Sequence, residues 1–170
     1  MEILMHRGSI DYMPASPMSS EEFETLLPLA VEWARVQERR ILERGLKLTA
    51  AQAADAQAMG VEHPERVRMM PVVAISRPEH PILKPAAEAA HLINPFTRGL
   101  TLGYGIYIRA DEVSDRLLLA HEFVHVAQYE RMGGLEPFLR QYLFECLTMG
   151  YYLAPLETEA VQKAASLAGK

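Results

Sequence analysis

The sequence predicts a single α+β domain that is mainly helical and carries a small, mostly antiparallel sheet. Three observations support this fold class. Residues 21–44 and nearly all residues after 114 have helical character, whereas residues 100–109 (LTLGYGIYIR) alternate with the period of two that is typical of a strand. A length of 170 residues is usual for one domain. We therefore expect one domain over residues 1–170, with residues 1–20 as an irregular lead-in.

The first predicted helix follows this lead-in. Residues 8–20 are rich in Ser, Pro and Gly, a composition that favours irregular structure. The helix should cover residues 21–44 and end near Gly45. Pro28 must either kink this helix or start its main part, because proline is tolerated only in a first helical turn.

A second helix and a first strand should follow. Thr49 and Gln52 form a capping-box pattern, which predicts a short, Ala-rich helix that stops at Gly60. Residues 69–76 are a candidate strand, in which Pro71 favours a position at an edge or an end.

The clearest strand comes after a loop. Residues 77–99 contain four prolines and one glycine, and we expect them to be mostly loop around a short helix near 85–92. In residues 100–109 every second side chain is apolar, and the opposite face carries Gly103 and Gly105. The predicted apolar face consists of Leu100, Leu102, Tyr104, Ile106 and Ile108.

Composition and charge argue against several classes of partner. The chain has a formal net charge of −5, and its basic residues form no run or stripe. This pattern argues against a nucleic-acid partner and against an acidic membrane surface. The apolar runs are too short to cross a bilayer, and we see no export signal at the N-terminus. Because Cys146 is the single cysteine, we expect a reducing, cytoplasmic location. Oligomeric state is not indicated.

The segment with the most chemical information is HEFVH at residues 121–125, within the helical region. Residues four apart leave the same face of a helix, so His121 and His125 can direct two ring nitrogens to one Zn²⁺ at about 2.1 Å. Glu122 would reach a metal-bound water and take its proton as a general base. The alternative is a polar patch on an amphipathic helix, because this short pattern also arises by accident.

A catalytic zinc site needs a third protein ligand. No His lies six residues beyond His125, so we expect a carboxylate from a later helix. The helical region should break at residues 133–134 and 150–155, which leaves a last helix over residues 156–168. The candidates for the third ligand are Glu130, Glu136, Glu145, Glu157 and Glu159.

Helical phase favours Glu157 among these candidates. Glu157 is in phase with an apolar face, where a carboxylate is costly unless a charge such as that of zinc compensates it. Glu159 is in phase with polar residues and pairs with Lys163, so we expect it to be solvated. Glu145 is the second choice, on a mixed face of the preceding helix. An acid stabilised only by the helix dipole is the alternative explanation for Glu157.

Residues 100–162 resemble the bacterial gluzincin-type metallopeptidases. The resemblance depends on the strand LTLGYGIYIR, the helix LLLAHEFVHVAQYERMGG and the segment YYLAPLETEA. In that family an AHExxHxxQ helix follows a TxGxxIyx strand and precedes an ExEA or ExxA helix. The resemblance implies a zincin-like fold with the sheet beside the HExxH helix. It also implies zinc on His121, His125 and Glu157, with Glu122 catalytic.

One position departs from the family pattern. Many gluzincins carry an Asp directly after ExxA, where it can brace a ligand imidazole, but this chain has Val161 there. A ligand His almost always has such an acceptor, so another group must supply it.

The same resemblance suggests how a substrate binds. In HExxH enzymes an edge strand beside the active-site helix pairs with extended peptide, so Gly103, Tyr104 and Gly105 are candidate substrate-binding residues. The glycines would allow close approach, or they are only a twist or bulge in the strand. Tyr152, or its neighbour Tyr151, could donate a hydrogen bond to an oxyanion; half-buried packing is the alternative.

We therefore expect a zinc metallopeptidase that holds one Zn²⁺ per chain and hydrolyses peptide bonds in a peptide or protein substrate. Two other functions remain open: a catalytically inactive zinc module with a structural or regulatory binding role, and a metal-free helical domain. Metal analysis separates the last from the other two.

Overall fold

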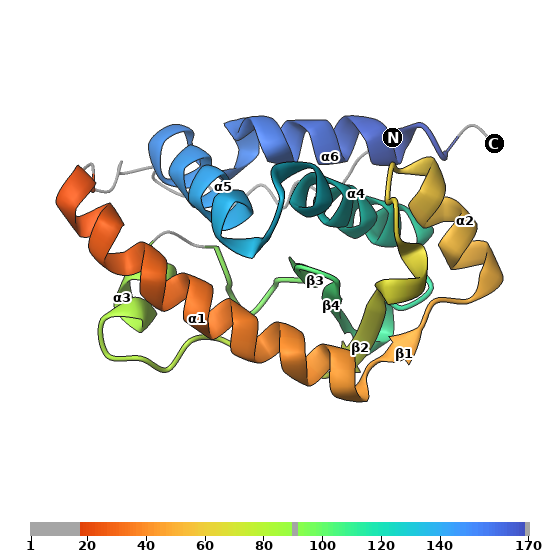
Figure 1. Ribbon diagram of the computed structural model, residues 1–170, viewed down its shortest axis with the longest axis horizontal. Helices are drawn as coiled ribbons and strands as arrows, with labels where there is room; N and C mark the ends of the chain where they lie inside the picture. Colours follow the sequence, from red (N-terminus) through yellow and green to blue (C-terminus); the bar gives the residue numbers. More distant parts are fainter. Residues whose placement is uncertain (1–17, 90–91, 169–170) are drawn as a thin grey trace.

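The computed structural model describes residues 18–89 and 92–168, and it shows an α+β fold in which helices cover both faces of a four-stranded sheet (Figure 1). The helices and strands are α1 (Ser20–Arg44), β1 (Leu46–Lys47), α2 (Ala50–Ala58), β2 (Arg68–Val72), α3 (Leu83–Ala89), β3 (Gly99–Leu102), β4 (Gly105–Arg109), α4 (Arg116–Met132), α5 (Leu135–Met149) and α6 (Pro155–Ala165). Most of the expected lead-in, residues 1–17, lies outside the described residues.

The first helix confirms the predicted boundaries with one difference. Ser19 caps α1 through a reciprocal capping box, in which its hydroxyl accepts from Glu22 N (3.1 Å) and its own N–H donates to Glu22 Oε2 (2.7 Å). Pro28 lies inside the helix and does not start it. Leu27 and Val31 on either side of it are buried, so tertiary packing outweighs the hydrogen bond that proline cannot donate.

The next elements also lie close to their predicted places. The Thr49–Gln52 capping box opens α2, which ends just before Gly60. β2 is shorter than the predicted strand 69–76, because its partner β4 ends at Arg109, opposite Val72.

The sheet has the order β1-β2-β4-β3 and is mixed. β1–β2 and β3–β4 pair antiparallel, whereas β2–β4 pair parallel. The parallel pair requires the long connection that contains α3. The edge strand β1 pairs only with residues 68 and 69 of β2. Pro71 lies beyond the end of β1, so the N–H that proline lacks has no partner strand there and no sheet hydrogen bond is lost. β3 is the other edge strand.

The prediction of one strand over residues 100–109 is wrong: the segment is a hairpin. β3 and β4 are joined by a turn at Gly103 and Tyr104, and the φ of Gly103 is +63°. The reversal places Leu100 and Leu102 on one face of the sheet and Ile106 and Ile108 on the other. Strict alternation continues through a two-residue turn, so the pattern alone could not separate a hairpin from one long strand.

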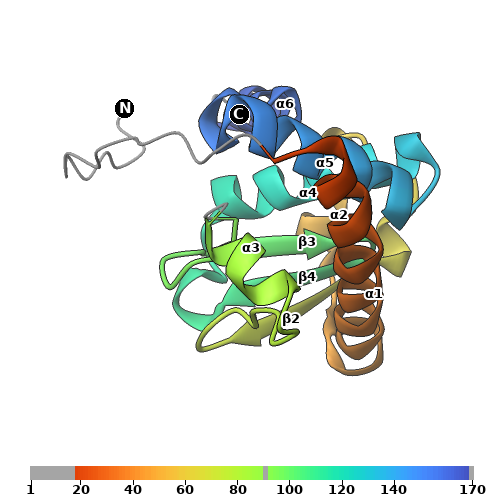
Figure 2. The same ribbon diagram turned by 90° about the vertical axis from the view of Figure 1, so that its left-hand side faces the viewer.

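Two apolar clusters fix the sheet between helices. On one face, Ile106 and Ile108 pack in a cluster with Phe123 and Val126 of α4. On the other face, Leu102 and Tyr107 pack in a cluster with α1 and α5. α6 lies on the far side of α4 from the sheet (Figure 2), so α4 is enclosed between the sheet and α6. None of the helices in the described part is long and apolar enough to span a bilayer.

Candidate metal centre

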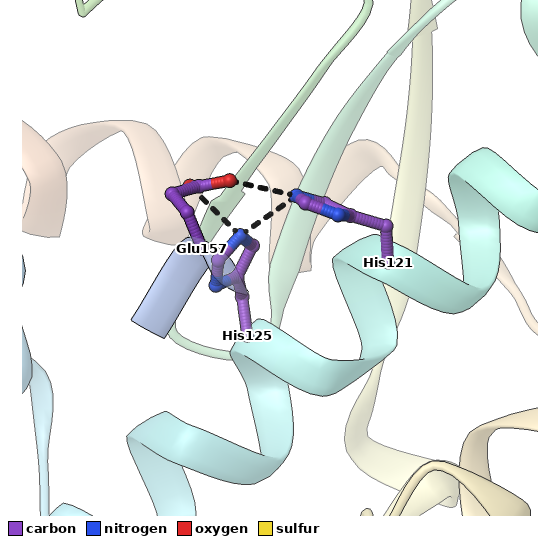
Figure 3. A group of neighbouring side chains, drawn as sticks. All are labelled: His121, His125 and Glu157. Atoms are coloured by element: carbon purple, nitrogen blue, oxygen red, sulfur yellow. Dashed lines mark hydrogen bonds and ion pairs between the residues drawn. The ribbon is translucent and has the colours of Figure 1, made fainter. Parts of the chain in front are cut away.

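Two histidines of α4 and one glutamate of α6 direct their polar atoms to one point (Figure 3). His121 Nε2 and His125 Nε2 are 3.0 Å apart. Glu157 Oε2 lies 3.2 Å from His121 Nε2, and Glu157 Oε1 lies 3.2 Å from His125 Nε2. Among the described residues, these three form the one group of His, Cys, Asp and Glu side chains that is arranged to hold a metal ion.

The local sequence explains why these side chains meet. Asp115 caps α4 by accepting a hydrogen bond from Leu118 N (2.9 Å), and the helix then runs to a left-handed Gly133. The two histidines are therefore one turn apart on the same helix face, as their spacing predicts. α6 begins at Pro155 after a 3₁₀ turn, and its apolar face turns Glu157 towards α4. The side chain of Glu157 is only 4% exposed.

The distances between these atoms fit a tetrahedral zinc site. A metal at about 2.0–2.1 Å from each ligand, with tetrahedral angles, places the ligand atoms about 3.3–3.4 Å apart. The observed separations of 3.0–3.2 Å are slightly shorter than this. Two imidazoles and one carboxylate are also a donor set typical of catalytic zinc, with a fourth position free for water or substrate.

The charges around the three residues favour a cation. Burial alone would lower the pKa of His125, but the hydrogen bond and charge of Glu157, together with Glu122 and Gln128, raise it to about 9. Burial would raise the pKa of Glu157, but the hydrogen bonds and charges of His121 and His125 lower it. A buried carboxylate that stays ionised between two imidazoles is the environment in which a divalent cation is stabilised.

Gln128 supplies the hydrogen-bond acceptor for the His125 imidazole that Val161 cannot supply. Its side chain is fully buried, and Gln128 Nε2 donates to Leu156 O (2.9 Å) and to Glu159 Oε2 (3.0 Å). Since both partners can only accept, Gln128 Oε1 must be the atom that accepts from His125 Nδ1–H (2.8 Å). In the neutral imidazole this leaves the Nε2 lone pair for a metal. Val161 is 47% exposed and takes no part.

Glu159 is less solvated than its helical phase indicated. Its predicted pair with Lys163 is present at 2.9 Å, but Arg131 also binds it through both guanidinium NH groups. Arg131, Lys163 and Gln128 lower the pKa of Glu159 to about 2, against the opposing effect of burial. Glu159 therefore links Arg131 and Lys163 at the surface to Gln128, and it helps to hold the amide that contacts His125.

We predict that Gln128→Leu weakens zinc binding about 10–100-fold, the usual effect of losing such a bracing contact. The substitution removes the acceptor of His125 Nδ1–H and leaves Leu156 O and Glu159 without their amide donor. Zinc affinity measured by competition with a chromophoric chelator checks this. Gln162→Leu, on the exposed side of α6, is the matched control and should bind zinc like the wild type. Equal affinity in both variants would show that Gln128 does not brace the ligand.

Two tyrosines also approach the carboxylate of Glu157. The Tyr142 hydroxyl donates to Glu157 Oε1 (2.7 Å), and its ring packs edge-on against His125 with the centroids 5.7 Å apart. Burial and the charge of Glu157 raise the pKa of Tyr142 well above its usual value, so this phenol stays a donor. Burial, then Glu157 and Glu122, also raise the pKa of Tyr151.

The structure favours Tyr151 over Tyr152 as the candidate oxyanion donor. The two residues share a 3₁₀ turn, and their rings pack edge-on with the centroids 5.4 Å apart. Tyr152 is 90% exposed, whereas Tyr151 is 39% exposed and lies within the electrostatic reach of Glu157 and Glu122. The expectation for Tyr152 is therefore replaced by Tyr151, at the rim of the site.

Glu145, the second choice for a ligand, has a different role. It is buried, and its carboxylate accepts from Leu156 N (2.8 Å) and from Gln141 Nε2 (2.6 Å). The N-cap residue of α6 is Ala154, which has no side chain to cap the helix. Glu145 therefore satisfies an N–H of the first turn of α6 from the neighbouring helix.

Glu122 lies on α4 beside His121, with its carboxylate against β3. It is 4% exposed, and Thr101 Oγ1 donates to Glu122 Oε2 at 2.6 Å. The buried carboxylate is not part of the group formed by His121, His125 and Glu157. This is the place that a base acting on a metal-bound water needs.

The structure does not leave Gly103, Tyr104 and Gly105 open to a substrate. All three are buried: the two glycines lie against α1, and the Tyr104 ring packs edge-on against Tyr129 of α4. Glu38 of α1 accepts from Tyr104 N (2.9 Å), and a Cβ on Gly105 would lie 3.0 Å from Ile41. The hairpin explains the difference, because it turns this end of the segment away from the free edge. The edge strand beside α4 is β3, at residues 99–102.

Thr101 and Tyr142 also contact the site, and the sequence alone did not predict these contacts. Thr101 corresponds to the Thr of the TxGxxIyx pattern, but the pattern does not say what that hydroxyl contacts. Tyr142 gave no signal, since its bond to Glu157 joins α5 to α6 and depends on how these helices pack.

The chain matches no protein-family model, and no curated protein or solved structure is significantly similar to it.

Proposed function

We propose that this chain is a zinc-dependent metallopeptidase in which His121, His125 and Glu157 hold one Zn²⁺ and Glu122 is the general base. The single observation that carries the proposal is the meeting of both HEFVH histidines with Glu157, a residue that lies 32 positions further along the chain. A zinc ion bound there lowers the pKa of a water ligand towards 7 and polarises a carbonyl.

Each side chain of the site has a role in the proposed amide hydrolysis. Glu122 takes a proton on its carboxylate and can later return it to the leaving amine. Tyr151 stands at the rim, where its hydroxyl can donate to an oxyanion. Gln128 and Tyr142 hold His125 and Glu157 in place. Burial of Glu122 and His125 keeps bulk water from competing for these contacts.

The free edge of β3 supports an extended peptide as the substrate class. Arg109 N donates to Arg98 O (2.9 Å), so residues 98, 100 and 102 direct their main-chain polar groups towards β4. Gly99 and Thr101 then direct theirs towards the open edge, where no strand of the described part pairs with β3. An extended chain can add there by strand pairing, next to α4.

A library of unfolded peptides tests the proposal. Zinc-loaded protein should cleave members of the library, and a chelator should abolish cleavage, which added zinc then restores. Cleavage that survives complete removal of the metal would exclude a metallopeptidase.

A non-catalytic zinc module is the second candidate, and one observation favours it. Glu122 is buried and its carboxylate is already bound to Thr101, an arrangement that a structural role also explains. Protein that binds one zinc and cleaves no peptide under any condition would support this module.

A further inference from the structure

We propose that two residues of β3, Thr101 and Gly99, set the position of the Glu122 carboxylate, and that Thr101 is the positioning residue of the base. The inference rests on the proposed function for its catalytic meaning. The contact between β3 and Glu122 is itself independent of any activity.

The Thr101 hydroxyl has one proton to donate and two acceptors within reach. Its Oγ1 lies 2.6 Å from Glu122 Oε2 and 3.1 Å from Glu122 O. The shorter distance is typical of an O–H donor to an ionised carboxylate, so Glu122 Oε2 is the main acceptor. Both residues are buried, at 6% and 4% exposed, and water cannot replace this bond. One carboxylate oxygen is therefore held, and Oε1 is left to receive a proton.

On its other side, the carboxylate of Glu122 fits against β3 only because Gly99 has no side chain. Its backbone lies in a strand and has no left-handed φ, so conformation does not require glycine. A Cβ at this position would lie 2.8 Å from Glu122 Cδ and would overlap Glu122 Oε1. The three nearest heavy atoms to that Cβ all belong to Glu122. Glycine is thus required here by the close approach of the base.

The same two residues direct their main-chain groups towards the free edge of β3, as described above. A peptide paired with that edge would lie against the strand that holds the base. Replacing the Thr101 side chain leaves the main chain in place. The substitution should therefore change the chemical step and leave substrate binding nearly unchanged.

Thermal melting of four pairs of variants tests the contact without any need for activity. In the wild-type background, Gly99→Ala should lower Tm by about 2–10 °C, because the methyl group displaces a buried carboxylate. In the Glu122→Ala background the same substitution should leave Tm unchanged or raise it slightly, since alanine restricts the unfolded chain. Thr101→Val should lower Tm by about 2–8 °C in the wild-type background and by clearly less in the Glu122→Ala background.

Kinetics on a cleaved peptide test the positioning role. With zinc content unchanged at one per chain, Thr101→Val should lower kcat about 10-fold or more and change KM less than threefold. Thr101→Ser keeps the hydroxyl and should recover most of kcat. In the Glu122→Gln background, Thr101→Val should cause no further loss, because the two residues act as one unit.

The outcomes separate this inference from the proposed function. Gly99→Ala could lower Tm in the wild-type background and not in the Glu122→Ala background, while the wild type cleaves no peptide. This result would support the contact and reject both the peptidase and the catalytic role of Thr101. Equal Tm losses in both backgrounds would overturn the contact. A kcat for Thr101→Val equal to that of the wild type would overturn the positioning role, even if the melting pairs behave as expected.

Discussion

Replacing Glu122 by glutamine should lower peptide hydrolysis by about 10²–10⁴-fold while the protein keeps one zinc per chain. The amide is nearly isosteric with the carboxylate and its oxygen can still accept from Thr101 Oγ1, so the fold should be retained. Glutamine cannot take a proton from water, however. Because Glu122 is not among the three ligand residues, the metal should stay bound.

Wild type and Glu122→Gln should be compared in their zinc-loaded forms on the same unfolded peptides, with zinc measured in each sample. Glu136→Gln is the matched control, because it makes the same chemical change at a side chain that is 57% exposed, on α5. It should cleave at the wild-type rate. Equal rates for wild type and Glu122→Gln would remove Glu122 from the mechanism.

The second large effect is expected from Glu157→Ala, which should abolish most zinc binding and destabilise the protein in the presence of zinc. Three protein ligands leave no redundancy, and metal binding is coupled to folding. The variant also leaves Tyr142 and both imidazoles without their carboxylate partner. Zinc per chain after dialysis, together with Tm in zinc and in chelator, measures both consequences.

Two neighbouring glutamates are the controls for that result. Glu145→Ala should keep one zinc per chain and lose about 1 kcal/mol of unfolding free energy, the usual cost of a lost helix cap. Glu159→Ala should also keep stoichiometric zinc, with weaker affinity because Gln128 loses one of its partners. Zinc that disappears in Glu145→Ala and persists in Glu157→Ala would move the third ligand to α5.

Much of the helical fold was predictable from local sequence. The capping box at Thr49 and the breaks at Gly133 and Gly150 act through neighbouring residues, and the structure has helix ends at these places. The hairpin was not predictable from the alternation in residues 100–109, because a two-residue turn preserves that alternation. Nor was the parallel pairing of β2 with β4, which depends on contacts far apart in the sequence.

In the candidate site, too, local sequence predicted some features, whereas others depend on contacts between helices. The spacing of His121 and His125 and the helical phase of Glu157 were sufficient to select the three residues that the structure brings together. Helical phase gave Glu159 too simple a role, because Arg131 and Gln128 reach it from another helix. Bonds that join separate elements decide such details, and a single sequence does not record them.

Anomalous diffraction at the zinc absorption edge would show whether His121, His125 and Glu157 hold a zinc ion. Crystals should be grown from protein purified without added zinc and from protein saturated with zinc. We expect one peak per chain, about 2.0–2.1 Å from His121 Nε2, His125 Nε2 and one carboxylate oxygen of Glu157. No peak at these three residues in the zinc-saturated crystals, or a peak held by other side chains, would contradict this expectation.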